Sequence, residues 1–460
     1  MELGGLELNN EFELMPNNDI HLQQFRNPER YFNPDDISVP PGYQIEVFAQ
    51  GLDTPIGLVF TENGDMLIAD SGSASGNPKI IRLSNDNFEV VAEGFNVPIT
   101  GVNYRNGDIY VSHKGVITVI KSNGTRQDII SGLPSYGDYS NNQVTFGQDG
   151  KIYFGQGTAT NSGVVGLDND WIPEHPYFRD SPGNYIMLNG LNFQTKNILI
   201  PADKTAYTGA FSQFGIPNRQ LYEVVKGEIR ASGSVLQANL DGSDLRLIAW
   251  GFRNPVQMKF DQFNRLFISN QGFDNRGSRP IANASDEFHL LAPGTWYGWP
   301  DYTEGEAVTQ PRYTPEGGNQ PELLLASLPS VPLRPFAVFP PSSHVMGFDF
   351  NTNPDFGVVG DVYIAEYGSI QYDPSSGIIH SNAGHRVTKI DMNTGQITTF
   401  AINKTGFPAF TTMGGGFGSP TDIVFGPDGA MYITDYTSTL LESPEIFLPN
   451  TGVIWKISRT

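Results

Sequence analysis

Residues 419–436 read SPTDIVFGPDGAMYITDY, and this stretch decides the fold. Two segments in which apolar side chains recur flank the turn Gly-Pro-Asp-Gly. Apolar residues that alternate with polar ones are typical of β-strands. An Asp-Gly pair supplies the positive φ that a tight turn requires. The segment therefore predicts a β-hairpin.

The same pattern occurs five more times: a polar or Pro-containing entry, an apolar strand that ends in an aromatic residue, a turn, and a second apolar strand. A further strand pair follows each hairpin, as in PKIIRLSNDNFEVVAEG. Six four-stranded antiparallel sheets in succession predict an all-β, six-bladed β-propeller. The other copies cover residues 54–70, 97–113, 141–157, 253–270 and 344–367, and the aromatic anchors are Phe60, Tyr104, Phe146, Phe260, Phe350 and Phe425.

One unpaired strand remains at each end of the repeat array. Residues 43–51 (YQIEVFAQG) and 452–458 (GVIWKIS) are both strand-like. We expect them to pair in one blade, because such closure removes exposed sheet edges.

Two stretches, about 159–232 and 271–342, interrupt the repeat. Both are rich in Gly, Pro, Asn and aromatic residues. Long segments without strands of their own are often functional, so we interpret them as long inserted loops that cover one face of the ring. Residues 1–35 are interpreted as an N-terminal arm and residues 36–460 as a single propeller domain.

The composition narrows the class of function. The chain has 460 residues, no cysteine and a net charge of -21. Absence of cysteine excludes disulfides, iron–sulfur clusters, zinc-thiolate sites and a cysteine nucleophile. The acidic balance argues against a nucleic-acid partner and says little else about function.

The location and the oligomeric state are less constrained. No run of 18 apolar residues is present, so no membrane span is expected. The first residues have neither a basic region nor an apolar region typical of a signal peptide. We expect an extracellular or cell-surface protein whose signal peptide has been removed. An intracellular location stays open as the alternative. The oligomeric state is left open.

The segment AWGFRNP (residues 249–255) stands at the entry to the fourth hairpin. Hairpin turns favour Gly, Asn or Asp and do not require an arginine. Arg253 and Asn254 are therefore candidate site residues at the mouth of the ring. Strand-end register places Asn270, His344, Glu366 and Asp435 at the same mouth. The structural alternative is that Arg253 pairs with an acid such as Asp435 or Glu366 to hold blades together.

A longer composite, GSVLQANLDGSDLRLIAWGFRNP (233–255) with DEFHLLAPGTWYGWPD (286–301), resembles the soluble PQQ-dependent sugar dehydrogenases, also called glucose/sorbosone dehydrogenases. The resemblance covers about residues 40–458. It implies a six-bladed propeller that oxidises a sugar or related alcohol with PQQ and calcium, and therefore a small-molecule or carbohydrate substrate. It also implies that Arg253 and Asn254 hold the cofactor and that backbone oxygens of Gly272 and Phe273 bind calcium.

The chain departs from the family pattern at several positions. Tyr139 stands where the family has its base histidine, and Thr158 where it has the acid that orients the base. Gly368, Ser419 and Thr421 stand where the family has a lysine and two arginines. These departures predict that ordinary PQQ-dependent glucose oxidation is weak or absent, because PQQ carries three carboxylates that require cationic partners.

The candidate site residues follow from these two lines of reasoning. His344 or His113 is a candidate base in place of the missing histidine. Acids among carbonyl-presenting residues suit calcium, which prefers oxygen ligands. The catalytic candidates are Arg253, Asn254, His344 and Tyr139, the cofactor-binding candidates are Arg253, Asn254, Lys114 and Thr421, and the metal candidates are Gly272, Phe273, Asp286 and Glu287, with Asp274 beside them.

Two further functions stay open on the same scaffold. One is a calcium-dependent hydrolase or lactonase, for which acids at the strand ends would supply ligands. The other is a non-catalytic carbohydrate- or protein-binding propeller. Its candidate stacking surfaces are Trp171, Trp296, Tyr297 and Trp299, although these aromatic residues also suit a packed core.

Overall fold

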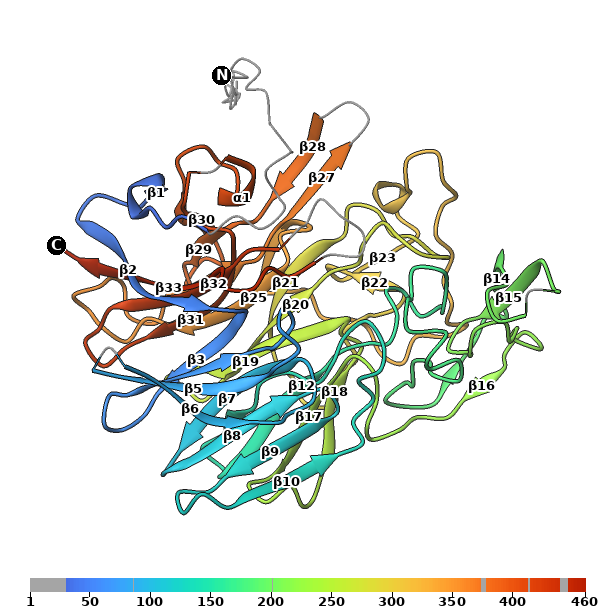
Figure 1. Cartoon of the computed structure of the whole chain (residues 1–460). Helices are drawn as coiled ribbons and strands as arrows, with labels where there is room; N and C mark the ends of the chain where they lie inside the picture. The colour runs from blue at the N-terminus through green and yellow to red at the C-terminus, as the bar shows by residue number, and fades with distance from the viewer. Residues whose placement is uncertain (1–29, 86, 201, 374–377, 413, 439–445) are drawn as a thin grey trace, which may run out of the picture.

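The structure is a computed structural model, which describes residues 30–460 except residues 86, 201, 374–377, 413 and 439–445. Strands dominate it, and the described helical segments are short: η2 (Pro34–Asp36), η3 (Pro311–Tyr313) and α1 (Ala409–Thr412). The strands form six antiparallel blades around one axis (Figure 1), so the predicted six-bladed propeller is confirmed.

Each blade contains four main strands. The first blade is β3 (Pro55–Phe60), β4 (Met66–Asp70), β5 (Lys79–Ser84) and β6 (Asn87–Glu93), and the second is β7 (Ile99–Arg105), β8 (Asp108–His113), β9 (Val116–Ile120) and β10 (Arg126–Ser131). The third is β11 (Thr145–Phe146), β12 (Lys151–Gln156), β17 (Ser234–Asn239) and β18 (Arg246–Trp250), and the fourth is β19 (Asn254–Phe260), β20 (Leu266–Gln271), β21 (Ser285–Leu290) and β24 (Ala337–Pro341). The fifth is β25 (Val345–Phe350), β26 (Val362–Glu366), β29 (Arg386–Ile390) and β30 (Ile397–Asn403), and the sixth is β31 (Ser419–Phe425), β32 (Met431–Tyr436), β33 (Gly452–Arg459) and β2 (Tyr43–Leu52).

The ring closes as the sequence predicts. β2 pairs with β33 in antiparallel register from Tyr43 opposite Arg459 to Leu52 opposite Gly452. The N-terminal segment adds a second link, because β1 (Ile37–Ser38) pairs with β30 and becomes a fifth strand of the fifth blade. Residues 30–52 therefore join the last two blades. The rest of the predicted arm, residues 1–29, lies outside the described residues.

Six apolar clusters form the core, one between each pair of neighbouring blades. In the cluster between the fifth and sixth blades, for example, Tyr363 and Val387 pack with Ile433 and Trp455. The remaining clusters join the first and second, second and third, third and fourth, fourth and fifth, and sixth and first blades. Apolar burial therefore holds blade to blade around the whole ring.

A polar layer occupies the axis, at the position three residues before each aromatic anchor. Gln143, Gln257 and Asp422 contribute side chains from the third, fourth and sixth blades. Gln257 Nε2 donates to Asp422 Oδ1 at 2.8 Å, and the backbone N–H of Leu58 donates to Oδ2 at 3.2 Å. The other three blades have glycine there, and a Cβ on Gly347 would lie 2.1 Å from Asp422 Oδ1. Glycine is required because the polar side chains fill its space.

The two predicted insertions are folded and have a shared core. The first, between β12 and β17, forms the two-stranded sheets β13 (Ile186–Met187) with β16 (Val224–Val225) and β14 (Asn192–Lys196) with β15 (Thr205–Gly209), seen at one side of Figure 1. The second insertion forms β22 (Tyr302–Thr303) with β23 (Glu306–Ala307). A third hairpin, β27 (Ser369–Asp373) with β28 (Ile378–Ala383), projects from the fifth blade.

The prediction that residues 271–342 lie outside the repeat was wrong in part. β21 and β24 fall in this range and are the outer strands of the fourth blade. The sequence hides β21 because its polar residues are buried: Asp286, Glu287 and His289 are each at most 5% exposed. Hydrogen bonds satisfy these buried polar groups. Because polar residues stand where other strands have apolar ones, β21 lacks the alternation by which the other strands were predicted.

Candidate functional site

The candidate site lies at the end of the ring where each first strand begins and each second strand ends. Arg253 directly precedes β19, and Asn270 is near the end of β20. The side-chain Oδ1 of Asn270 accepts hydrogen bonds from the backbone N–H groups of Arg253 and Asn254, both at 3.2 Å. This arrangement fixes the backbone from which the Arg253 side chain projects.

Arg253 is buried among the side chains of neighbouring loops, with 2% of its side chain exposed. Its guanidinium Nη2 donates to Asp274, and its Cζ lies 4.6 Å from the centre of the Tyr139 ring. Its buried Nε has no hydrogen-bond partner among the described residues. Arg253 therefore keeps a donor that the protein itself does not use.

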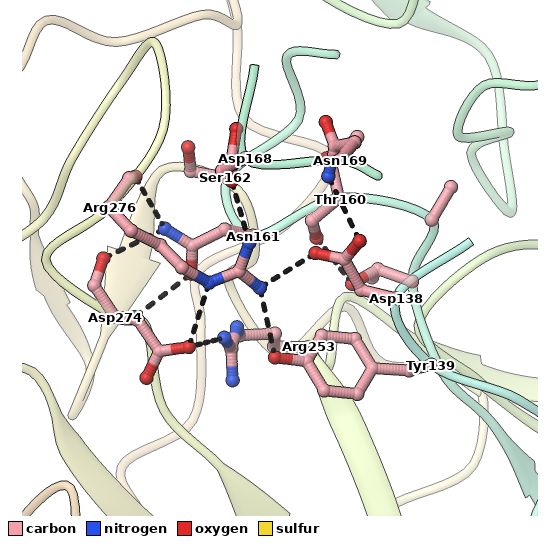
Figure 2. A network of polar contacts seen from close by, with 12 residues as sticks. Asp138, Tyr139, Thr160, Asn161, Ser162, Asp168, Asn169, Arg253, Asp274 and Arg276 are labelled. Carbon is pink, nitrogen blue, oxygen red and sulfur yellow. Dashed lines mark hydrogen bonds and ion pairs between the residues drawn. The ribbon is translucent and has the colours of Figure 1, made fainter. Parts of the chain in front are cut away.

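A second guanidinium, that of Arg276, joins three carboxylates (Figure 2). It donates to Asp138 and Asp168 at 2.6 Å each and to Asp274 at 3.2 Å. The same group donates to the Tyr139 hydroxyl at 3.3 Å. Because Asp168 belongs to the first insertion and Asp274 to the loop after β20, Arg276 ties the two insertions together over the ring.

Asn161 reinforces this junction through the backbone. Its Oδ1 accepts from the Asp274 N–H at 2.9 Å, and its Nδ2 donates to the Asp274 carbonyl at 2.8 Å. Asp274 is thus held by main chain and side chain at once. These backbone hydrogen bonds fix the position of Asp274 relative to Arg253.

His344 completes the cluster from the fifth blade. Its Nδ1 lies 3.1 Å from the Gly368 carbonyl, so this nitrogen carries the hydrogen. Its Nε2 lies 3.6 Å from Asp274 Oδ1, and 28% of the side chain is exposed. Burial alone would lower the pKa of His344, but Asp274 and Asp286 outweigh burial and raise it.

The charges around Tyr139 and Asp274 determine which groups can move a proton. Burial would raise the pKa of Asp274, but the positive charges of Arg253, His344 and Arg276 lower it overall, so this carboxyl stays ionised. Burial raises the pKa of Tyr139 to about 12. Tyr139 therefore keeps its proton at neutral pH and is excluded as a base, which leaves the imidazole of His344 as the candidate.

Two predicted cofactor contacts are used by the scaffold. The Asn254 amide donates to Gln271 Oε1 at 2.8 Å and accepts from Asn142 at 3.1 Å, which joins the third and fourth blades. The Thr421 hydroxyl donates to the Pro55 carbonyl at 2.8 Å, which joins the sixth and first blades. Lys114 is half-buried in the turn after β8, and no contact of the described residues joins its side chain to Arg253.

The predicted metal residues do not form one ligand set. Asp286 accepts from the N–H groups of Gly272 at 2.7 Å and Val345 at 2.9 Å. Glu287 is the next residue of the same strand and faces the other way, where it accepts from Asn270 and contacts His289 at 2.9 Å. Phe273 is buried in the core of the insertions. Within the described ranges, no group of three His, Asp or Glu residues is placed to hold a metal ion.

Arg253 does pair with an acid, as the structural alternative expected, but the acid is Asp274 and the two named partners were wrong. Glu366 pairs with Arg386 at 3.0 Å and Asp435 with Arg30 at 2.5 Å. Both acids lie at the expected ends of their strands, but they belong to other polar groups. The predicted stacking surface is also wrong, since all four aromatic residues are buried: Trp171, Trp296, Tyr297 and Trp299.

Sequence reasoning missed Arg276, Asp138 and Asp168. The string FDNRGSR (273–279) contained a signal, because an acid and two arginines in a glycine-containing loop directly follow a second strand. Asp138 and Asp168 gave no such signal. They lie far from this loop in sequence, and only the fold of the first insertion brings them to it.

The fold and the cluster together define a six-bladed β-propeller that carries a polar cluster under long inserted loops. No family model matches the chain, and no curated protein matches it. The likeness to solved structures is therefore one of fold alone, at 11–16% sequence identity for the glucose dehydrogenase-like propellers.

Three solved structures illustrate this likeness. The PQQ domain of a pyranose dehydrogenase from Coprinopsis cinerea is 14% identical, with a TM-score of 0.59 over 94% of this chain and 98% of that one. A calcium structure of a Trichoderma reesei enzyme of carbohydrate-active family AA12 is 14% identical, with a TM-score of 0.56 over 94% and 99%. A putative glucose dehydrogenase from Thermus thermophilus is 16% identical, with a TM-score of 0.50 over 91% and 100%.

Proposed function

We propose that this propeller acts on a neutral sugar or related alcohol at its loop-bearing face, and that His344 accepts the proton of a bound hydroxyl group. The observation that carries the proposal is the arrangement of His344 beside Asp274, with the unused Nε of Arg253 close by. A histidine whose orientation is fixed by a carbonyl and a carboxylate is a suitable general base.

Each side chain has a separate role in this proposal. The Gly368 carbonyl holds the hydrogen on Nδ1 and leaves Nε2 as the acceptor. Asp274 stabilises the imidazolium that forms once Nε2 takes the proton. Arg253 donates to the hydroxyl oxygen as negative charge develops on it.

The cluster does not fit PQQ in the arrangement that the family resemblance implies. PQQ carries three carboxylates, and a buried carboxylate requires charged or N–H donors. Arg253 and Arg276 are already paired with acids, and the three family cation positions hold Gly368, Ser419 and Thr421. An oxidation at this site would therefore need a different electron acceptor, or PQQ bound in a different pose.

A binding propeller without turnover is the second candidate. It is favoured because the acids and guanidinium groups of the cluster neutralise one another and still present polar atoms to hydroxyl groups. A calcium-dependent reaction is a third proposal, supported only by the oxygen-rich strand ends.

One experiment separates these candidates. Purified protein is titrated calorimetrically with a panel of neutral sugars and polyols, and oxidation is measured with an artificial electron acceptor, with and without PQQ and calcium. We expect sugar binding, and any turnover to fall at least about a hundredfold in His344→Gln, which removes the proton acceptor. His175→Gln, at a half-buried histidine in the first insertion, is the control.

Each outcome has a defined meaning. Binding without turnover under every condition supports the second candidate. Turnover that His344→Gln leaves intact contradicts the assigned base, and failure to bind any member of the panel contradicts both candidates.

A further inference from the structure

Asp274 contributes to more than the orientation of His344. It is the only carboxylate among the described residues that contacts Arg253, Arg276 and His344 together. An anionic ligand at this face would need the same guanidinium groups. Asp274 and such a ligand therefore compete for one position.

The charge of the whole cluster points the same way. Two guanidinium groups stand against the three carboxylates Asp138, Asp168 and Asp274, so the sum is 2 − 3 = −1 while His344 is neutral. The chain around it has a net charge of -21. A ligand carboxylate would meet repulsion from both, whereas a neutral hydroxyl group would meet donors and acceptors without that cost.

The ion pair with Asp274 leaves the Nε donor of Arg253 unused. This nitrogen is buried and has no partner in the described part of the chain, although 2% exposure leaves its side chain almost no contact with solvent. An unsatisfied buried donor destabilises the folded protein. A ligand oxygen that accepts from it would recover that loss.

We propose that Asp274 is a specificity-determining residue, a resident carboxylate that reserves Arg253 for neutral hydroxylated ligands and rejects anionic ones such as sugar acids and PQQ. Asp138 has the same effect at Arg276. The inference rests on the proposed function for the place of the ligand and deepens it by naming the excluded class.

The test reads anion binding instead of turnover. PQQ and glucuronate are titrated into the intact protein and into Asp274→Asn at low salt. Removal of the resident carboxylate frees Arg253, so we expect binding of both anions to be at least about tenfold tighter than in the wild type, which is the range of one charge-assisted hydrogen bond. Adding Arg253→Gln to Asp274→Asn should abolish the gain.

Two further variants keep the test decisive. Asp244→Asn frees Arg246, its partner at 2.8 Å near the outer edge of the third blade, and should gain nothing. If Asp274→Asn fails to fold, Asp138→Asn removes one of the three carboxylates that occupy Arg276 and should show a gain in the same direction, smaller because Asp168 and Asp274 remain. Tight wild-type binding of PQQ, or folded Asp274→Asn and Asp138→Asn without any gain, overturns the inference. Loss of sugar binding alone would contradict only the proposed function.

Discussion

At the scale of single residues, Asp422 places a buried carboxyl group in the polar layer of the ring. It lies on the axis, 1% exposed, and accepts hydrogen bonds from Gln257 and from the backbone of Leu58. These donors do not offset the loss of hydration: burial raises the pKa of Asp422 to about 6. The folded state therefore binds a proton more tightly than the unfolded chain does.

The stability of the protein should depend on this proton. A raised carboxyl pKa means that the contribution is complete below about pH 4 and is lost as the pH rises through about 6. Measured against Asp422→Asn, which cannot titrate, the wild-type free energy of unfolding should fall by about 3 kcal/mol between pH 4 and pH 7. Urea unfolding at several pH values checks this. A difference that is constant with pH would contradict the assignment.

At the scale of elements, the segment that leads into β1 and β2 acts as a clasp. The Arg30 guanidinium donates to Asp435 and to the carbonyls of Thr451 at 2.7 Å and Gly416 at 2.8 Å. Trp455 donates to the same Asp435 carboxylate at 2.9 Å. The pair is almost fully buried, with 6% of the Arg30 side chain exposed.

Loss of this clasp should be costly. Arg30→Ala leaves a buried carboxylate without its countercharge, and breaking such a pair costs about 3 kcal/mol or more. The matched control is Arg82→Ala, whose ion pairs are exposed and should be worth less than about 1 kcal/mol. Thermal unfolding of both variants gives the comparison. Equal effects would show that the clasp is no stronger than a surface pair.

The elements also show why the fold was easier to predict than the site. Hairpin turns and aromatic anchors are local in sequence, and the structure gives Gly64, Gly150 and Gly429 the positive φ that their turns require. β21 was not predicted because its buried acidic residues interrupt the alternation of apolar and polar residues. The partners of Arg253 come from loops that only the complete fold brings together, so sequence could propose Arg253 and His344 but could not connect them through Asp274.

At the scale of the whole molecule, the pairing of β2 with β33 completes the sixth blade and closes the ring. β2 covers the edge of β33, which would otherwise expose unpaired N–H and C=O groups over eight residues. Ala49 and Leu52 of β2 also pack in the cluster between the sixth and first blades. Both backbone hydrogen bonds and apolar burial therefore attach β2 to its neighbours in the ring.

A chain that begins at residue 53 should reveal this dependence. We expect a lower melting temperature and self-association through the exposed edge, because an open strand edge is a template for pairing. Light scattering and calorimetry against the intact chain are the measurements. A monomeric truncated protein with an unchanged melting temperature would show that closure adds nothing to stability.

The closing pair also sets an order of events during synthesis. β2 leaves the ribosome before the main strands of the first five blades, but its partner β33 lies roughly 400 residues later, so the pair has a very large sequence separation. The first blades can fold against one another while β2 is still unpaired. The sixth blade, and with it the closed ring, can form only when residues 452–459 have emerged. A premature stop anywhere before residue 452 therefore yields a chain whose first strand has lost its partner.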